Sequence, residues 1–107
     1  GPDSFLKTAQ EMAYTHHEKW DGTGYPQGLK GAEIPVSGRL MAVADVYDAL
    51  ISKRVYKPAF LHEQAVEIIK AGSGSAFDPD IVEAFLEIED DFRRIALEFS
   101  DDITVEE

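Results

Sequence analysis

The spacing of apolar residues constrains the fold of this chain more than any other feature. Apolar side chains recur at steps of three and four, as on one face of an α-helix, and no stretch shows the sustained two-residue alternation of a half-buried strand. Four segments follow the helical spacing: residues 5–18, 37–52, 62–71 and about 79–99. We therefore predict an all-α fold of about four helices.

Capping residues indicate where these helices begin. Ser4, Ser37 and Asp78 each stand before a helical segment, where a Ser or Asp oxygen can accept a hydrogen bond from the first turn. Pro79 follows at a first helical position, where its missing N–H costs nothing. The core-facing stripes expected on the four helices are Phe5, Ala9, Met12, Ala13 and His16; Leu40, Val43, Ala44, Tyr47, Leu50 and Ile51; Ala65, Ile68 and Ile69; and Ile81, Phe85, Ile88, Phe92, Ile95 and Phe99.

A long segment rich in glycine and proline separates the first two helices. Residues 21–36 hold four glycines and two prolines in sixteen positions, so they cannot form a regular element. A loop of this length in a compact domain is usually functional or disordered. Tyr25, Leu29 and Ile34 supply anchoring side chains, which favours an ordered loop.

The length of 107 residues is enough for one small domain. We assign residues 1–4 to a tag remnant or linker, 5–100 to the folded part and 101–107 to an acidic, frayed tail. The absence of cysteine excludes disulfides and thiolate metal sites, and it fits the cytoplasmic location that we expect. No apolar run approaches the roughly 20 residues needed to span a bilayer.

The charge is distributed unevenly along the chain. Residues 1–60 carry seven acidic and seven basic side chains, whereas residues 61–107 carry fourteen acidic and three basic ones, so the second part accounts for the net charge of −11. Such an acidic surface disfavours duplex nucleic acid and anionic membranes, both of which attract Lys and Arg. Any phosphate chemistry is expected in the neutral first part.

His16 and His17 are candidate metal ligands, because imidazole suits borderline transition metals. Neighbours on a helix point about 100° apart, so the two rings would more easily serve two ions than chelate one. The alternative is a surface pair, or one packed and one exposed histidine. The pair does not form an HExxH motif, which excludes a zincin.

Asp45 and Asp48 lie three residues apart in an otherwise apolar helical segment. Carboxylates in such surroundings need a metal, a hydrogen bond or a charged partner. The alternative to a metal role is an ion pair with Arg39 or Arg54.

The turn around Tyr25 and the bases at Arg54 and Lys57 are weaker signals. The glycines allow close backbone approach, but the segment matches neither GxGxxG nor a P-loop. The two bases could bind phosphate, although isolated bases are more often solvated surface charges.

Taken together, these residues resemble one known family. The runs HHEKWDGTGYPQGLKGAEIP and GRLMAVADVYDALISKRVYK closely resemble the HD-GYP pattern HHExxDGxGYPxGLxGxxIPxxxRIxxxxDxxDAxxxxRxY. The later run SGSAFDPDIVEAFL resembles the closing segment of that family, and the likeness covers roughly residues 5–90. The chain is therefore identified as similar to the C-terminal half of an HD-GYP domain.

This resemblance implies an HD-superfamily helical fold and a metal-dependent phosphodiesterase that hydrolyses cyclic di-GMP to pGpG and GMP. It implies two or three divalent ions, iron or manganese, with ligands at His16, His17 and Asp45. No side chain is assigned as the catalytic group, since the attacking group in the family is a metal-bound hydroxide. Tyr25 matches the residue that contacts the dinucleotide, and Arg54 and Lys57 match bases that hold its phosphates. The motif positions expected to support the ligands or the local structure are Glu18, Asp21, Gly22, Gly24, Pro26 and Asp48.

The chain also departs from the family pattern. The family's His-Asp pair and further ligands would precede residue 1, and no HD dipeptide occurs here. Three ligands cannot build a centre of several ions, so we expect a piece cut from a longer domain, rather than a natural remnant, that is inactive by itself. Its newly exposed helix faces should favour self-association. Gly38, where the family usually has Ala, should weaken the helix start slightly, and Val55 replaces a common Pro.

Three functions follow from these observations. The first is the output module of a bacterial response regulator or other two-component sensor protein, with a receiver or sensor domain upstream. The second is a degenerate, non-catalytic domain that binds a nucleotide or a partner protein. The third is an HD-superfamily phosphohydrolase for other nucleotides, including cyclic GMP-AMP.

Overall fold

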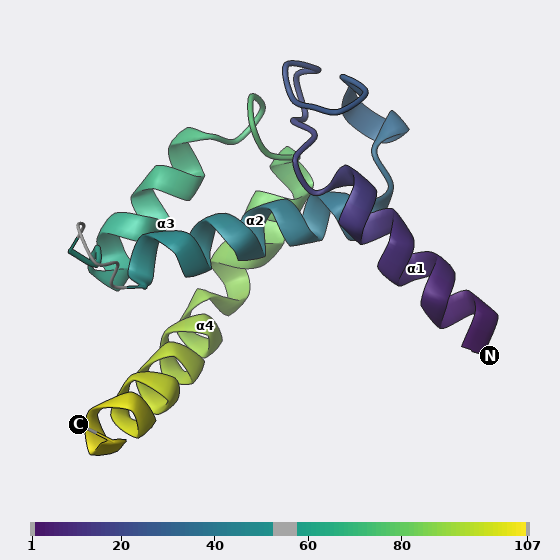
Figure 1. The fold of residues 1–107 in the computed structure, drawn as a ribbon. Helices are drawn as coiled ribbons and strands as arrows, with labels where there is room; N and C mark the ends of the chain where they lie inside the picture. The colour runs from purple at the N-terminus through teal and green to yellow at the C-terminus, as the bar shows by residue number, and fades with distance from the viewer. Residues whose placement is uncertain (1, 53–57, 107) are drawn as a thin grey trace.

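A computed structural model describes residues 2–52 and 58–106, and these are helical throughout apart from turns and loops. The helices are α1 (Pro2–Thr15), α2 (Val36–Ile51), α3 (His62–Ala71) and α4 (Pro79–Glu106), with a 3₁₀ turn, η1 (Gly31–Glu33), before α2. The described residues contain no strand beyond one isolated bridge between Ser73 and Phe77. The prediction of an all-α fold with four helices is confirmed (Figure 1).

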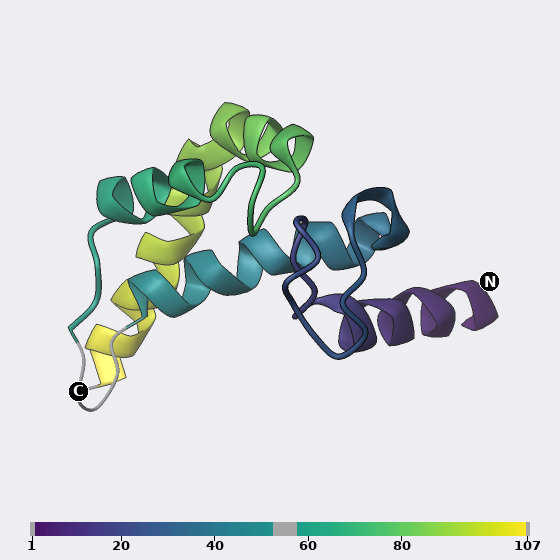
Figure 2. The same cartoon turned by 90° about the horizontal axis from the view of Figure 1, so that it is seen from above.

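Helix α2 forms the centre of the molecule and packs against each of the other three helices. Figure 2 shows α3 beside the C-terminal half of α2, α4 crossing α2, and α1 near the N-terminal end of α2. The main core lies between α2, α3, α4 and the turn that joins α3 to α4. Its buried residues are Ala42, Val43, Tyr47, Ala65, Val66, Ile69, Phe77, Val82 and Phe85.

The predicted starts of the helices are correct for α4 and wrong for α1 and α2. The backbone N–H of Asp80 donates to Asp78 Oδ1 at 2.9 Å, so Asp78 caps α4. Helix α1 already begins at Pro2, ahead of Ser4, and α2 begins at Val36 after Pro35, so Ser37 lies inside the helix. The Ser37 hydroxyl is instead buried without a hydrogen-bond partner among the described residues.

The ends of α1 and α4 also differ from the prediction. Helix α1 ends at Thr15 instead of residue 18, which places the two histidines in the turn that follows it. Helix α4 continues to Glu106, beyond the expected end near residue 99, and its backbone leaves helical geometry at Ile88 (φ −117°, ψ 15°).

All four of the expected core stripes include exposed residues. On α1, Phe5 is 73% exposed, and Figure 1 shows the N-terminal turns of this helix projecting away from the rest of the molecule. On α4, Phe85 and Phe92 face Tyr47, whereas Ile88 and Ile95 remain about half exposed. Leu40 of α2 and Ile68 of α3 are exposed as well. No described helix is long and apolar enough to cross a membrane.

Candidate functional site

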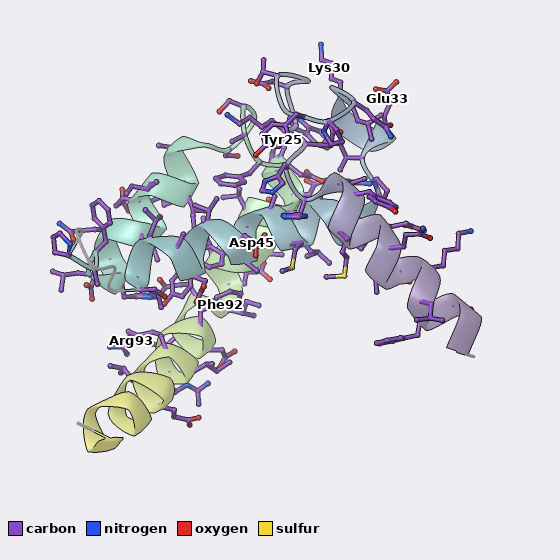
Figure 3. The ribbon with its side chains drawn as sticks, in the orientation of Figure 1. Tyr25, Lys30, Glu33, Asp45, Phe92 and Arg93 are labelled. Atoms are coloured by element: carbon purple, nitrogen blue, oxygen red, sulfur yellow. The ribbon has the colours of Figure 1, made fainter. Side chains whose placement is uncertain are left out.

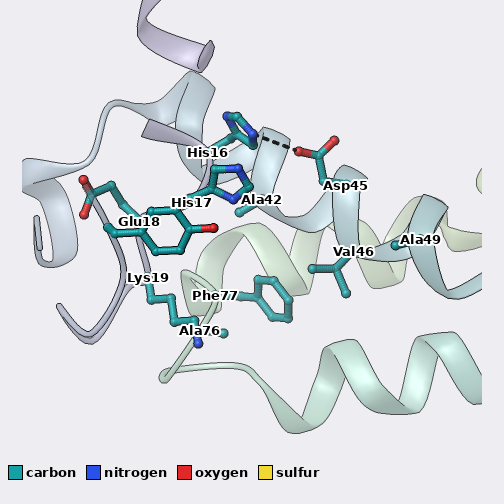
Figure 4. A pocket seen from close by; sticks show the side chains of 11 residues that line it. His16, His17, Glu18, Lys19, Ala42, Asp45, Val46, Ala49, Ala76 and Phe77 are labelled. Carbon is teal, nitrogen blue, oxygen red and sulfur yellow. Dashed lines mark ion pairs between the residues drawn. The ribbon is translucent and has the colours of Figure 1, made fainter. Parts of the chain in front are cut away.

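A pocket of about 410 Å³ opens between the loop after α1, the middle of α2 and the turn that joins α3 to α4. Figure 4 shows polar side chains from the first loop and from α2 above an apolar floor. Figure 3 places Tyr25 on the side of the loop that faces α2 and Asp45 on α2 itself, whereas Lys30 and Glu33 lie at the outer end of the loop. The pocket is lined by His16, His17, Glu18, Lys19, Tyr25, Ala42, Asp45, Val46, Ala49, Ala76 and Phe77.

His16 is oriented by a backbone carbonyl. Its Nδ1 lies 2.9 Å from the carbonyl oxygen of Met12, one turn back in α1. A carbonyl can only accept, so Nδ1 carries a proton, and a ring with this single proton presents the lone pair of Nε2. That Nε2 lies 3.8 Å from Oδ2 of Asp45. A nitrogen fixed in this way beside a carboxylate oxygen is the arrangement usual for metal-binding histidines.

His17 occupies a different position from its neighbour. Its ring stacks on Tyr25, with centroids 4.9 Å apart and planes 15° from parallel. The rings of His16 and His17 lie 3.9 Å apart and are tilted by 42°. The turn after α1 thus directs one imidazole towards Asp45 and the other towards the tyrosine, and both line the pocket.

The buried side chain of Glu18 connects two parts of the loop by hydrogen bonds. It is 3% exposed, and its two carboxylate oxygens accept the backbone N–H groups of Gln27 and Leu29, each at 2.8 Å. These bonds join the start of the loop to its far side. They also satisfy a charge that would otherwise be costly to bury.

The loop is also fastened to the turn between α3 and α4. The backbone N–H groups of Trp20 and Asp21 donate to the carbonyls of Ala76 (3.2 Å) and Ser75 (2.8 Å). Tyr25 N–H donates to the carbonyl of His17 at 3.2 Å. This crossing leaves no room for a side chain at Gly24, because a Cβ there would overlap the backbone of residues 17–19. These hydrogen bonds hold the loop around the pocket. Of the predicted anchors, Ile34 is buried, whereas Tyr25 is 61% exposed.

Other motif residues shape the loop away from the pocket. Asp21 Oδ1 accepts the Thr23 hydroxyl (2.6 Å) and the Thr23 backbone N–H (3.0 Å), and these bonds lower the pKa of the Asp21 carboxyl. Gly22 has φ +87° and donates its N–H to the carbonyl of Lys19, while Pro26 is exposed. Asp48 does not line the pocket; it is exposed and lies 3.4 Å from the Ser52 hydroxyl.

The ion pair proposed for Asp45 or Asp48 with Arg39 is wrong. Arg39 pairs instead with Asp78 at 2.9 Å, and its Nε donates to the carbonyl of Ile34 at 2.8 Å. It also lies over the ring of Trp20, 5.9 Å from the centroid. Arg39 thus ties the loop to α2 and to the cap of α4. Arg54 and Lys57 lie outside the described residues.

Sequence reasoning missed two contributors to this region, Lys19 and Phe77, and gave Arg39 the wrong partner. Phe77 was visible only as part of a turn segment, yet it is buried and forms the pocket floor. Lys19 was hidden because it occupies a variable position between two fixed motif residues. The sequence could have indicated the role of Arg39, because a basic residue at the start of a helix can form an ion pair with a buried carboxylate.

The donor set fits part of a metal site. His16 Nε2 and Asp45 Oδ2 converge, and both are ligand types that suit iron, manganese or zinc. Within residues 2–52 and 58–106, however, no group of three or more His, Asp or Glu side chains is assembled around one point. A complete site needs additional donors.

Comparisons with known proteins place this geometry in context. The family model described as "HD domain" matches residues 2–81. A cyclic di-GMP phosphodiesterase of Vibrio cholerae is 65% identical over 101 residues, which cover 94% of this chain and 20% of that protein. A 3′3′-cGAMP-specific phosphodiesterase of the same organism is 49% identical over 96 residues, covering 90% of this chain and 18% of that protein.

A solved structure agrees with the sequence comparisons. The crystal structure of a cyclic GMP-AMP-specific phosphodiesterase from V. cholerae superposes with a TM-score of 0.62 at 27% identity, over 84% of this chain and 22% of the other. The chain spans about a fifth of the length of the relatives that it matches.

Proposed function

The chain belongs to the HD domain family, among relatives of the HD-GYP phosphodiesterases, and from this we propose that it forms part of a metal-dependent enzyme that hydrolyses cyclic di-GMP. The observation that carries the proposal is the pairing of His16 with Asp45. The Met12 carbonyl fixes the imidazole so that its free nitrogen faces the carboxylate across 3.8 Å. This is a ligand pair in a pocket large enough for part of a nucleotide.

We assign the metal ligands of this chain to His16, His17 and Asp45. A divalent ion at these donors supplies Lewis acidity towards a phosphoryl oxygen. His16 is oriented by Met12, and Asp45 is carried on the central helix, so both are on parts of the fold that hold their positions. The donors still required would come from residues outside this chain, and we expect the 107 residues alone to be inactive.

The substrate-binding role falls to the loop. Tyr25 stacks on His17 and is 61% exposed, so its outer face is available for a base of the dinucleotide. Below it, Phe77 and Val46 provide an apolar floor that excludes water from one side of the pocket. Arg54 and Lys57 are proposed to hold substrate phosphates. The remaining motif residues, Glu18 above all, keep the loop in its place.

Cyclic di-GMP is preferred over cyclic GMP-AMP as the substrate. The relatives that are 65% and 57% identical are named cyclic di-GMP phosphodiesterases or probable ones, whereas the first relative named for 3′3′-cGAMP is 49% identical. A receiver or sensor domain upstream and a cytoplasmic location remain predictions.

Metal analysis and hydrolysis assays on two forms of the protein test this function. The first form is this chain, and the second extends it on the N-terminal side to include the rest of the HD domain. We expect iron or manganese, and turnover of cyclic di-GMP, in the extended form only. An extended form that is metal-free and inert would favour a non-catalytic domain that binds a nucleotide or a partner. Faster turnover of cyclic GMP-AMP would change the assigned substrate and leave the reaction class intact.

A further inference from the structure

Lys19 is the single lysine or arginine among the described residues that line the pocket. It lies between Glu18, which points into the loop, and Trp20, which packs beneath Arg39. Its position is one of the variable places in the motif, so the resemblance assigns it no role. The structure nevertheless puts its side chain at the pocket.

The backbone of Lys19 is fixed while its ammonium group is available. The Lys19 carbonyl accepts the Gly22 N–H at 2.9 Å, and Gly24 packs directly on the Lys19 backbone nitrogen. The side chain is exposed and forms no ion pair with any carboxylate in the described ranges. Its charge acts on Asp21 only as a minor cause of that residue's lowered pKa, after the bonds from Thr23.

The pocket has two chemically different sides. His16 and Asp45 lie on one side, and Figure 4 shows Lys19 on the other, near Ala76 and Phe77. A cyclic dinucleotide carries two phosphates, of which one reacts at a time. The donors at His16 and Asp45 serve the phosphate that reacts. Arg54 and Lys57, which are also proposed to contact phosphate, lie outside the described residues, so Lys19 is the described cation at the pocket that can meet the second phosphate.

We propose that Lys19 binds the second phosphate of the cyclic dinucleotide, the one that is not being hydrolysed. This inference rests on the proposed function and names a substrate contact within it. An ammonium group suits the task because it binds phosphate as a point charge with three donors. The contact is present before and during the reaction, so it contributes to substrate binding more than to the rate of the bound complex.

The test compares Lys19→Met, Lys19→Arg and a control, Lys30→Met, in the N-terminally extended protein. Lys30 belongs to the same loop but lies at its outer end and does not line the pocket. Each variant is assayed with cyclic di-GMP and with bis(p-nitrophenyl) phosphate, a phosphodiester that has no second phosphate. Equilibrium binding of cyclic di-GMP is measured alongside.

We expect Lys19→Met to raise the KM for cyclic di-GMP roughly tenfold, the usual scale for losing one charge-assisted contact, with a much smaller change in kcat. Turnover of bis(p-nitrophenyl) phosphate should stay the same. Lys19→Arg and Lys30→Met should both behave like the unchanged protein with cyclic di-GMP.

If Lys19→Met lost activity equally on cyclic di-GMP and on bis(p-nitrophenyl) phosphate, the proposal would be overturned, because the result would indicate general damage to the loop. Unchanged kinetics with cyclic di-GMP in Lys19→Met would overturn it as well. If the unchanged protein hydrolyses neither compound, the proposed function fails, and binding then decides the role of Lys19. Weaker binding of cyclic di-GMP in Lys19→Met would still support the phosphate contact, whereas equal binding or none would refute it.

Discussion

At Gly38, helix propensity and tertiary packing lead to opposite expectations. Propensity alone favours Ala inside a helix by about 1 kcal/mol. In the structure, however, Gly38 is buried where the end of α1 crosses α2, and a Cβ there would overlap the Thr15 side chain. The sequence indicated only that the glycine lowers the stability of the helix. The structure shows that the close contact between α1 and α2 requires a residue without a side chain at this position.

We predict that Gly38→Ala lowers the free energy of unfolding, because overpacking a close contact typically costs about 1–3 kcal/mol and exceeds the gain in propensity. Urea unfolding followed by circular dichroism measures the change. Ser73→Ala changes a small side chain at an exposed turn position and serves as the control. A more stable Gly38→Ala protein would show that α1 does not approach α2 this closely.

Asp45 allows the metal assignment to be tested at a single atom. Asp45→Asn keeps the shape of the side chain but removes the negative charge beside His16. We predict that it lowers the iron or manganese content of the extended protein and reduces cyclic di-GMP turnover at least tenfold, because a carboxylate binds hard cations better than an amide. Elemental analysis gives the metal content. Glu67→Gln on the exposed face of α3 is the matched control, and equal metal content in both variants would contradict the assignment.

Among the structural elements, the loop between α1 and α2 depends most on a single side chain. Glu18 replaces the missing regular hydrogen bonds of this segment by accepting two backbone N–H groups from across the loop. The turn between α3 and α4 holds the outside of the same loop through Trp20 and Asp21. The pocket is therefore formed by a loop that is fixed from both sides.

We predict that Glu18→Gln loosens this loop, because an amide has one acceptor oxygen and turns a donor towards one of the two N–H groups. The loss in stability should be about 1–3 kcal/mol, the usual cost of an unsatisfied buried group. Hydrogen exchange measured by NMR should show faster exchange at Gln27 and Leu29, with little change in α3. Glu83→Gln, exposed on α4, is the control. Unchanged protection at Gln27 and Leu29 would mean that Glu18 does not close the loop.

At the scale of the whole molecule, burial is concentrated on one side. The core joins α2, α3 and α4, while α1 carries Phe5, Leu6 and Tyr14 at 61–73% exposure. Large exposed apolar groups favour association between molecules. Within the described residues, Phe5 and Leu6 of α1 are left largely uncovered.

We predict that the 107-residue chain self-associates through α1 and that Phe5→Lys with Leu6→Lys shifts it towards monomer. Sedimentation velocity across a range of concentrations measures the change. Thr8→Lys on the same helix is the control for added charge. A chain that is already monomeric at high concentration would refute the prediction.

The sequence by itself determined the helical class, the starts of the four helices to within a few residues, and the glycine-rich loop, because these depend on local spacing and on backbone chemistry. It also indicated the residue types suited to metal and phosphate. Only the tertiary structure decided that Arg39 pairs with Asp78, that Glu18 closes the loop and that Phe77 forms the pocket floor. These contacts join residues up to 39 positions apart, and their formation depends on how the helices cross, which no local pattern of residues specifies.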